Sequence, residues 1–216
     1  MKNKFMKTIL ALIISVSTGF AQKELEEQTK ISNEGETQIT SQSDLPKSTA
    51  GLKGGYNLAT VKFDGNGDVG ERSGFHIGVY GESYFAKVAS VQIELNYSQQ
   101  GYEINSNSGT FTQKLNYINL PLSLKLYPIQ NFYFEAGPQV GLAISHKEEF
   151  DSEFNLFDSE QEFDPKSFDY GANVGVGVKT NDGFTLGARY YFGMGDIYDE
   201  GNPKNRVLQI SAGFAF

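Results

Sequence analysis

The sequence predicts an all-β chain that folds as an eight-stranded antiparallel up-and-down β-barrel. Apolar and polar residues alternate in eight segments after residue 50, and no long stretch places its apolar residues at the 3.6-residue period of a helix. The links between the segments are alternately short and long. With 24 Gly, 12 Tyr and 17 Phe among 216 residues, the composition also favours strands and turns. The expected strands are residues 51–60, 74–85, 89–98, 114–127, 131–146, 168–180, 183–193 and 206–216.

The first 49 residues precede the expected barrel. Residues 1–21 have a basic start, an apolar stretch and a small-residue cleavage site that ends at Ala21, so we expect a signal peptide there. The apolar stretch is about half as long as the ~20 residues that a spanning helix needs, which argues against an amino-terminal anchor. Residues 22–49 are rich in Glu, Gln, Ser and Thr and poor in large apolar groups, so we expect a flexible polar periplasmic tail.

The links indicate how the eight strands connect. Three are tight: "AKVA" joins the second strand to the third, "PIQ" the fourth to the fifth, and "ND", which leads into Gly183, the sixth to the seventh. Longer links follow the first, third, fifth and seventh strands. Outer-membrane barrels have this arrangement, with short turns in the periplasm and long loops outside. We therefore expect residues 50–216 to form a transmembrane barrel in the cell outer membrane, with four long external loops.

Each expected strand has one apolar face that bears no charge. In chain order this face includes Leu52 and Tyr56; Phe75, Ile77 and Val79; Val91, Ile93 and Leu95; Ile118, Leu120, Leu122 and Leu124; Phe134 and Val140; Val174 and Val176; Phe184 and Leu186; and Leu208 and Ile210. A charged side chain on the lipid face costs about 2–4 kcal/mol at the bilayer midplane. A face without charge therefore suits contact with outer-membrane lipid.

The opposite face of the strands is rich in glycine and carries four positive and four negative residues. Glycine weakens a strand, but the narrow interior of an eight-stranded barrel needs small residues, so we place this face inside. Buried charges need partners, and an equal count of both signs suits a lumen of paired charges. We expect a lumen charge network of Lys53, Glu82, Glu94, Lys125, Glu135 and Arg189. Eight strands leave room only for these side chains, so we do not expect an open pore.

The carboxyl-terminal strand ends in an aromatic residue. Phe214 and Phe216 lie on its apolar face, and Phe216 is the last residue of the chain. A terminal aromatic resembles the recognition signal of barrels that the outer-membrane assembly machinery inserts. We therefore expect Phe214 and Phe216 to act as a barrel-insertion signal, with this machinery as a partner during biogenesis.

Four stretches of the chain resemble a known family. They are "YINLPLSLKLYPIQNFYFEAGPQVGLAIS", "FDYGANVGVGVK", "LGARYYFGMGDI" and "QISAGFAF", and they resemble the outer-membrane β-barrel domain family common in Bacteroidota, which includes the PorT-like proteins. The resemblance spans roughly residues 50–216 and is most specific at the proline-bearing fourth strand and the "EAGPQVG" strand after it. It implies an eight-stranded outer-membrane barrel, and most members have no assigned biochemical activity.

Composition and motifs exclude several kinds of chemistry. The net charge of -8 argues against a nucleic-acid partner, and the absence of cysteine excludes a thiolate metal site and a cysteine nucleophile. Ser73, His76 and Glu71 supply the residue types of a hydrolase, but no nucleophile motif surrounds them. We therefore expect no enzymatic activity and no cofactor, with His76 hydrogen-bonded inside the lumen.

The first long link contains the only calcium-like pattern that we find. Its stretch "DGNGDVGE" places Asp64, Asn66 and Asp68 at alternate positions, as at the start of a calcium loop. The glycine and glutamate that an EF-hand needs further on are replaced by Val69 and Phe75. We expect no metal site, and the weak alternative to an Asp/Gly turn is an external Ca²⁺ site formed by Asp64, Asn66, Asp68 and Glu71.

The third long link combines acidic residues with aromatic residues. Its four phenylalanines are Phe150, Phe154, Phe157 and Phe163. Charge runs are usually only solvated, but aromatic residues that recur among acids favour docking on a partner. We expect a protein partner, such as a basic protein, to bind here; a flap over the barrel mouth is the alternative.

These observations predict a small integral outer-membrane barrel with a filled polar lumen and a structural or surface-interaction role through its external loops. One alternative is a PorT-like accessory component of a secretion or assembly system. Another is a soluble periplasmic lipocalin-like carrier of an apolar ligand, which would need the apolar face to point inward.

Overall fold

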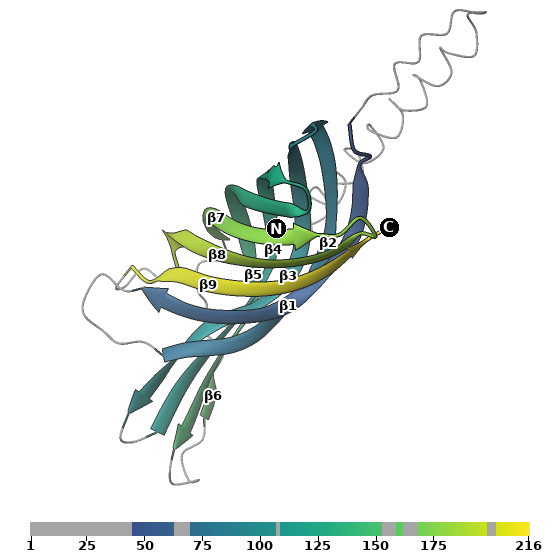
Figure 1. The fold of residues 1–216 in the computed structure, drawn as a ribbon. Coiled ribbons are helices and arrows are strands. Elements are labelled where there is room, and N and C mark those ends of the chain that lie inside the picture. The colour runs from purple at the N-terminus through teal and green to yellow at the C-terminus, as the bar shows by residue number, and fades with distance from the viewer. Residues whose placement is uncertain (1–44, 63–69, 107–108, 153–158, 162–167, 198–201) are drawn as a thin grey trace, which may run out of the picture. The chain divides into compact units, whose positions relative to one another are not determined.

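The structure is a computed structural model that describes residues 45–62, 70–106, 109–152, 159–161, 168–197 and 202–216. The described residues form nine strands and no helix (Figure 1). The strands are β1 (Thr49–Lys62), β2 (Gly70–Ala86), β3 (Ala89–Ser106), β4 (Gly109–Ile129), β5 (Phe132–Ser152), β6 (Ser159–Gln161), β7 (Phe168–Lys179), β8 (Phe184–Asp196) and β9 (Lys204–Ala215). The signal peptide and most of the polar tail that we expect fall in residues 1–44, outside the described part.

Eight of the nine strands close into a ring. β1 pairs with both β2 and β9, so the first and last strands of the barrel are joined, and β4 pairs with β5. All pairs are antiparallel, and the order around the ring is β1, β2, β3, β4, β5, β7, β8, β9. β6 has three residues and pairs, among the described strands, with β5 alone. The predicted eight-stranded antiparallel up-and-down barrel is confirmed.

Three tight turns lie at one end of the ring, which we call the turn end. They connect β2 to β3, β4 to β5 and β7 to β8. The last turn needs Gly183 because its φ is +87°, a left-handed conformation that other residues adopt at a cost. The chain also ends here, since the Phe216 amide donates to the Ala50 carbonyl at 2.8 Å. By the rule for outer-membrane barrels the turn end faces the periplasm.

The strands at the opposite, external end are longer than the sequence predicts. Residues 99–106 of β3 pair with residues 109–116 of β4. The prediction of a long loop after the third strand is therefore wrong. β5 likewise continues to Ser152 and carries β6 on its edge, and the extended strands project in the lower part of Figure 1. The extensions contain more polar residues than the other strands, so the alternation by which we recognised those strands is weak there.

The two faces of the ring differ as expected. Outward side chains such as Leu52, Ile77 and Ile210 are more than half exposed, whereas Lys125 and Arg189 are buried inside. From Phe75 to Phe85, β2 covers about 33 Å along the strand, or about 25 Å along the axis at a tilt of about 40°, which matches the apolar band of membrane barrels. The outward apolar face contradicts the lipocalin-like alternative. Among the described residues, no helix is long and apolar enough to span a membrane.

Candidate functional site

The lumen near the turn end contains a cluster of hydrogen bonds around Glu82. Lys179 of β7 reaches across to Glu82 of β2, with 2.7 Å between Nζ and Oε2. The other carboxylate oxygen accepts the hydroxyls of Ser90 at 2.6 Å and Tyr127 at 2.5 Å. Glu82 therefore belongs to the predicted charge network by location, but its ionic partner is Lys179, a lumen residue outside the six that we named.

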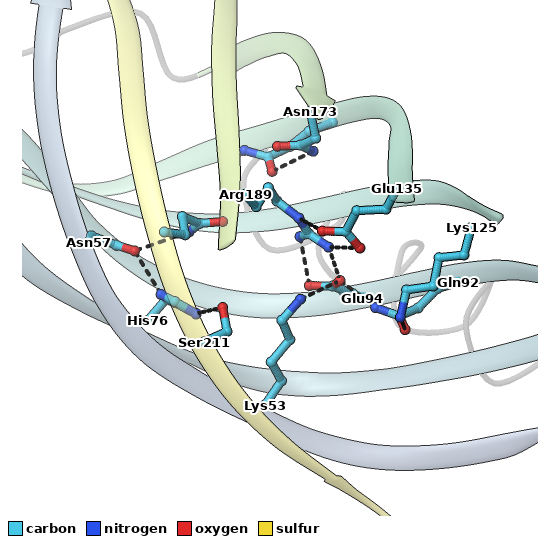
Figure 2. A network of polar contacts seen from close by, with 12 residues as sticks. Lys53, Asn57, His76, Gln92, Glu94, Lys125, Glu135, Asn173, Arg189 and Ser211 are labelled. Carbon is cyan, nitrogen blue, oxygen red and sulfur yellow. Dashed lines mark hydrogen bonds and ion pairs between the residues drawn. The ribbon is translucent and has the colours of Figure 1, made fainter. Parts of the chain in front are cut away.

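A second cluster lies deeper in the lumen around Arg189, and we call Lys53, Glu94, Glu135 and Arg189 the central charge cluster. Arg189 of β8 donates Nε to Oε1 of Glu135 at 2.7 Å and Nη1 to Oε2 of Glu94 at 3.0 Å, and its Nη2 contacts both carboxylates. Lys53 of β1 donates to Oε1 of Glu94 at 3.2 Å. Figure 2 shows the guanidinium between the two carboxylates. The cluster thus balances two positive with two negative charges and links β1, β3, β5 and β8.

Lys125 joins this cluster through an amide instead of a carboxylate. Its Nζ donates to Oε1 of Gln92 at 2.5 Å, and Nε2 of Gln92 donates to Oε1 of Glu94 at 2.6 Å (Figure 2). Lys125 also lies 4.1 Å from the ring centroid of Tyr133, a cation–π distance. Glu135 is its direct cross-strand neighbour, yet Lys125 forms no ion pair with any described residue.

His76 is the centre of a third set of bonds, nearer the external end. Its Nδ1 lies 2.7 Å from Oδ1 of Asn57 and its Nε2 lies 2.9 Å from Oγ of Ser211. The Asn57 amide nitrogen donates to Ser98 at 2.9 Å, so Oδ1 is the acceptor toward His76. Nδ1 therefore carries a proton, and in the neutral imidazole Nε2 accepts a hydrogen bond from the Ser211 hydroxyl.

The order Ser211, His76, Asn57 is that of a nucleophile, a base and an orienting residue. All three residues are at most 5% exposed, so a substrate carbonyl could reach Ser211 only by displacing the side chains that fill the lumen. The arrangement suits a structural network better than acyl transfer. The structure does not assemble the other combination, since Ser73 faces outward and bonds the Tyr56 hydroxyl at 2.5 Å while His76 faces the lumen.

The external end of the lumen contains a cluster of buried apolar side chains, which the sequence did not lead us to expect. This external apolar cluster consists of Val61, Tyr102, Leu115, Tyr117, Ala143 and Ile197. Below it, Asn205 donates to Asp169 at 2.8 Å and to the Tyr117 hydroxyl at 3.3 Å. Val61 and Leu115 could have indicated this cluster in the sequence, because each is a large aliphatic residue at a position that faces the lumen.

Several predicted site residues fall outside the part that can be described. Asp64, Asn66 and Asp68 are in residues 63–69, while Glu71 is exposed on the outer face of β2. The backbone of Phe150 is in β5, opposite Ser159 of β6, but Phe154, Phe157 and Phe163 lie outside the described residues. Within the described ranges, no group of His, Asp and Glu is arranged to hold a metal ion.

The two terminal phenylalanines lie on the outer face at the turn end. Phe214 faces the Phe184 ring, with 6.3 Å between the ring centroids. Phe216 is 77% exposed. Both are therefore accessible from the membrane side of the closing strand.

Known proteins share this barrel. The crystal structure of Neisserial surface protein A (NspA) superposes with a TM-score of 0.52 at 16% identity, over 79% of this chain and 100% of that chain. Ail of Yersinia pestis is 17% identical with a TM-score of 0.44, over 79% and 100%. OprG from Pseudomonas aeruginosa is 15% identical with a TM-score of 0.44, over 80% and 97%. No curated protein matches by sequence.

Family assignment rests on the sequence as well as on the fold. Residues 20–199 match the family described as "Outer membrane protein beta-barrel domain", which is most of the chain. This match agrees with the closed ring, the apolar outer face and the polar lumen. The chain belongs to the outer membrane protein beta-barrel domain family and is located in the outer membrane.

Proposed function

We propose that this protein is a closed outer-membrane barrel with a structural or surface-interaction role rather than a role in transport. The observation that carries the proposal is the filled lumen. The central charge cluster crosses the barrel between four strands, and the buried side chains of the external apolar cluster lie beyond it. Ions would have to break buried charge pairs and then pass through apolar side chains.

A planar-bilayer recording of the purified full-length protein tests this proposal. We expect no stepwise conductance above that of the bare bilayer. Migration on unheated SDS gels, compared with boiled samples, verifies that the inserted protein is a folded barrel. Steady channel openings from a heat-modifiable protein would contradict the closed lumen.

We further propose that the acidic and aromatic segment of residues 148–164, which begins within β5, docks a protein partner. Support comes from the sequence of residues 148–164, which contains eight acids and four phenylalanines, and from the backbone of β5 and β6, which extends the sheet beyond the ring at the external end. Replacing Phe150, Phe154, Phe157 and Phe163 by Ser should abolish capture of a partner by the intact barrel while heat-modifiability is retained. Equal capture of the partner by the unmodified protein and by the variant would contradict this role.

Insertion by the barrel assembly machinery through Phe214 and Phe216 is a related proposal. It is supported by their exposure on the strand that closes the ring against β1. Phe216→Ser should reduce the amount of heat-modifiable barrel in the outer membrane. The control is Phe85→Ser, because Phe85 is an outward aromatic residue of similar exposure to Phe214 near the same end, and it should leave assembly nearly unchanged.

The PorT-like accessory role rests on the resemblance alone, and a secretion assay of a deletion strain tests it.

A further inference from the structure

One buried carboxylate in the lumen has no cationic partner among the described residues. Four carboxylates are buried in this part of the chain, and the three glutamates pair with Lys53, Lys179 or Arg189. The fourth is Asp169 of β7, which is 5% exposed. Arg206 lies nearby on β9, but its guanidinium bonds two backbone carbonyls and faces the ring of an outer-face phenylalanine. Because a buried carboxylate without a counter-charge is costly, Asp169 calls for compensation.

The external links that the structure does not describe offer little positive charge to Asp169. Lys166 is the one basic residue in the sequence of these links. Their acidic residues are Asp64, Asp68, Glu153, Asp158, Glu162, Asp164, Asp199 and Glu200. With eight acids for one lysine, these links compete for cations, so a cation from solvent is the more available partner for Asp169.

Oxygen atoms without hydrogen-bond partners lie on three neighbouring strands around Asp169. Oδ2 of Asp169 accepts from Nδ2 of Asn205 at 2.8 Å, which fixes the Asn205 amide, because a carboxylate can only accept. Oδ1 of Asp169, Oδ1 of Asn205 and the Tyr191 hydroxyl have no hydrogen-bond partner among the described residues. Asn205 and Tyr191 are both 1% exposed. Buried polar atoms normally have partners, so these three oxygens indicate a bound group.

Two glycines allow tyrosine rings to lie beside Asp169. Gly141 is the cross-strand partner of Asp169 on β5, and Gly171 is two residues further along β7. A Cβ at Gly171 would lie 2.8 Å from Cε2 of Tyr191, and a Cβ at Gly141 would lie 3.4 Å from Cδ1 of Tyr117. Both hydroxyls are close enough to the Asp169 carboxylate to interact with it electrostatically. The carboxylate and the two hydroxyls therefore share one small region of the lumen.

We propose that Asp169, Asn205 and Tyr191 bind a sodium ion, with the Tyr117 hydroxyl beside it. All the ligand atoms are oxygens, which hard cations prefer. One carboxylate balances one positive charge, whereas Ca²⁺ usually takes about six to eight oxygens, several of them from carboxylates. The ion supplies the partner that Asp169 lacks and links β7, β8 and β9 beneath the external apolar cluster.

Urea unfolding of the full-length barrel in lipid vesicles tests the site, in NaCl and in choline chloride of equal ionic strength. The protein is refolded in each salt, so that the ion can bind as the lumen forms. Above the dissociation constant, each tenfold rise in Na⁺ should raise the folding equilibrium constant about tenfold, and choline should have no such effect.

Three variants locate the ion. Asp169→Asn should abolish the dependence on Na⁺. Asp182→Asn, which removes an exposed carboxylate from the turn between β7 and β8, should keep it. Lys166→Gln should also keep it, because the proposal does not use that lysine.

Three results would overturn the proposal. If Na⁺ and choline act equally on the unmodified protein, a proton and not an ion neutralises Asp169. If Asp169→Asn keeps the dependence, the ion binds elsewhere. If only Lys166→Gln shows the dependence, Lys166 is the partner of Asp169 in the unmodified protein. Should Asp169→Asn not fold, Tyr191→Phe replaces it, and the proposal requires that this variant need a higher Na⁺ concentration for the same stabilisation.

Discussion

The central charge cluster and the external apolar cluster fill the same lumen with opposite chemistry. The charge cluster is held by directional hydrogen bonds, so the Arg189 guanidinium requires defined positions of the Glu94 and Glu135 carboxylates. The apolar cluster depends on close packing, which tolerates small shifts of its members. The comparison indicates a division of roles, in which the charges fix how the strands align and the apolar residues seal the external end.

Removing Arg189 should have the largest effect, because it leaves Glu94 and Glu135 buried with Lys53 as their only nearby cation within the cluster. We expect Arg189→Leu to lower the free energy of unfolding by about 3–5 kcal/mol, the usual cost of breaking a buried ion pair from one side. Urea titration of the barrel in lipid vesicles measures it. Arg189→Lys keeps the charge but not the fork of donors and should recover part of the loss. A change below about 1 kcal/mol would show that the cluster does not hold the strands together.

Truncation in the apolar cluster should cost less and should also affect sealing. Leu115 is fully buried, so Leu115→Ala should lower the free energy of unfolding by about 2–3 kcal/mol, near the lower end for such changes because the cluster lies at the end of the barrel. The same variant should admit small ions more readily in planar bilayers. The matched control is Leu126→Ala, since Leu126 faces lipid and leaves the lumen unchanged. Equal ion leakage from both variants would contradict the seal.

The sequence could predict the ring and both of its faces, because the period-two alternation and the lengths of the links can be read directly from one sequence. Partner choice could not be predicted in the same way. Lys125 lies opposite Glu135 in the register but bonds Gln92, and Glu82 finds Lys179 across the lumen. Such contacts depend on the shear of the closed barrel, which no local pattern encodes. The extension of β3 was missed for a different reason: residues 99–106 contain only two large apolar residues, Tyr102 and Ile104, so the alternation is too weak to mark a strand.

A glycine beside the charge cluster offers a finer test of how little space the lumen has. A Cβ at Gly175 would lie 2.8 Å from both the Ala188 carbonyl and Oε1 of Glu135. Gly175→Ala should therefore lower the free energy of unfolding by about 1–3 kcal/mol, as overpacking does. Gly81→Ala is the control, because a Cβ there meets nothing within 4 Å. If both variants unfold at the same urea concentration, the charge cluster is less tightly packed than we infer.

The smallest effect should come from the bonds around His76. Ser211→Ala removes one neutral hydrogen bond to Nε2, so the free energy of unfolding should fall by about 1 kcal/mol. His76→Leu should cost more, because it also leaves the Asn57 carbonyl oxygen with only the 3.1 Å bond from Gln209. The same proteins also test whether Ser211 is a nucleophile or only a hydrogen-bonding residue. A fluorophosphonate probe should label none of them. Labelling of the unmodified barrel that Ser211→Ala abolishes would show that Ser211 is a reachable nucleophile, and the view of this network as packing would then be wrong.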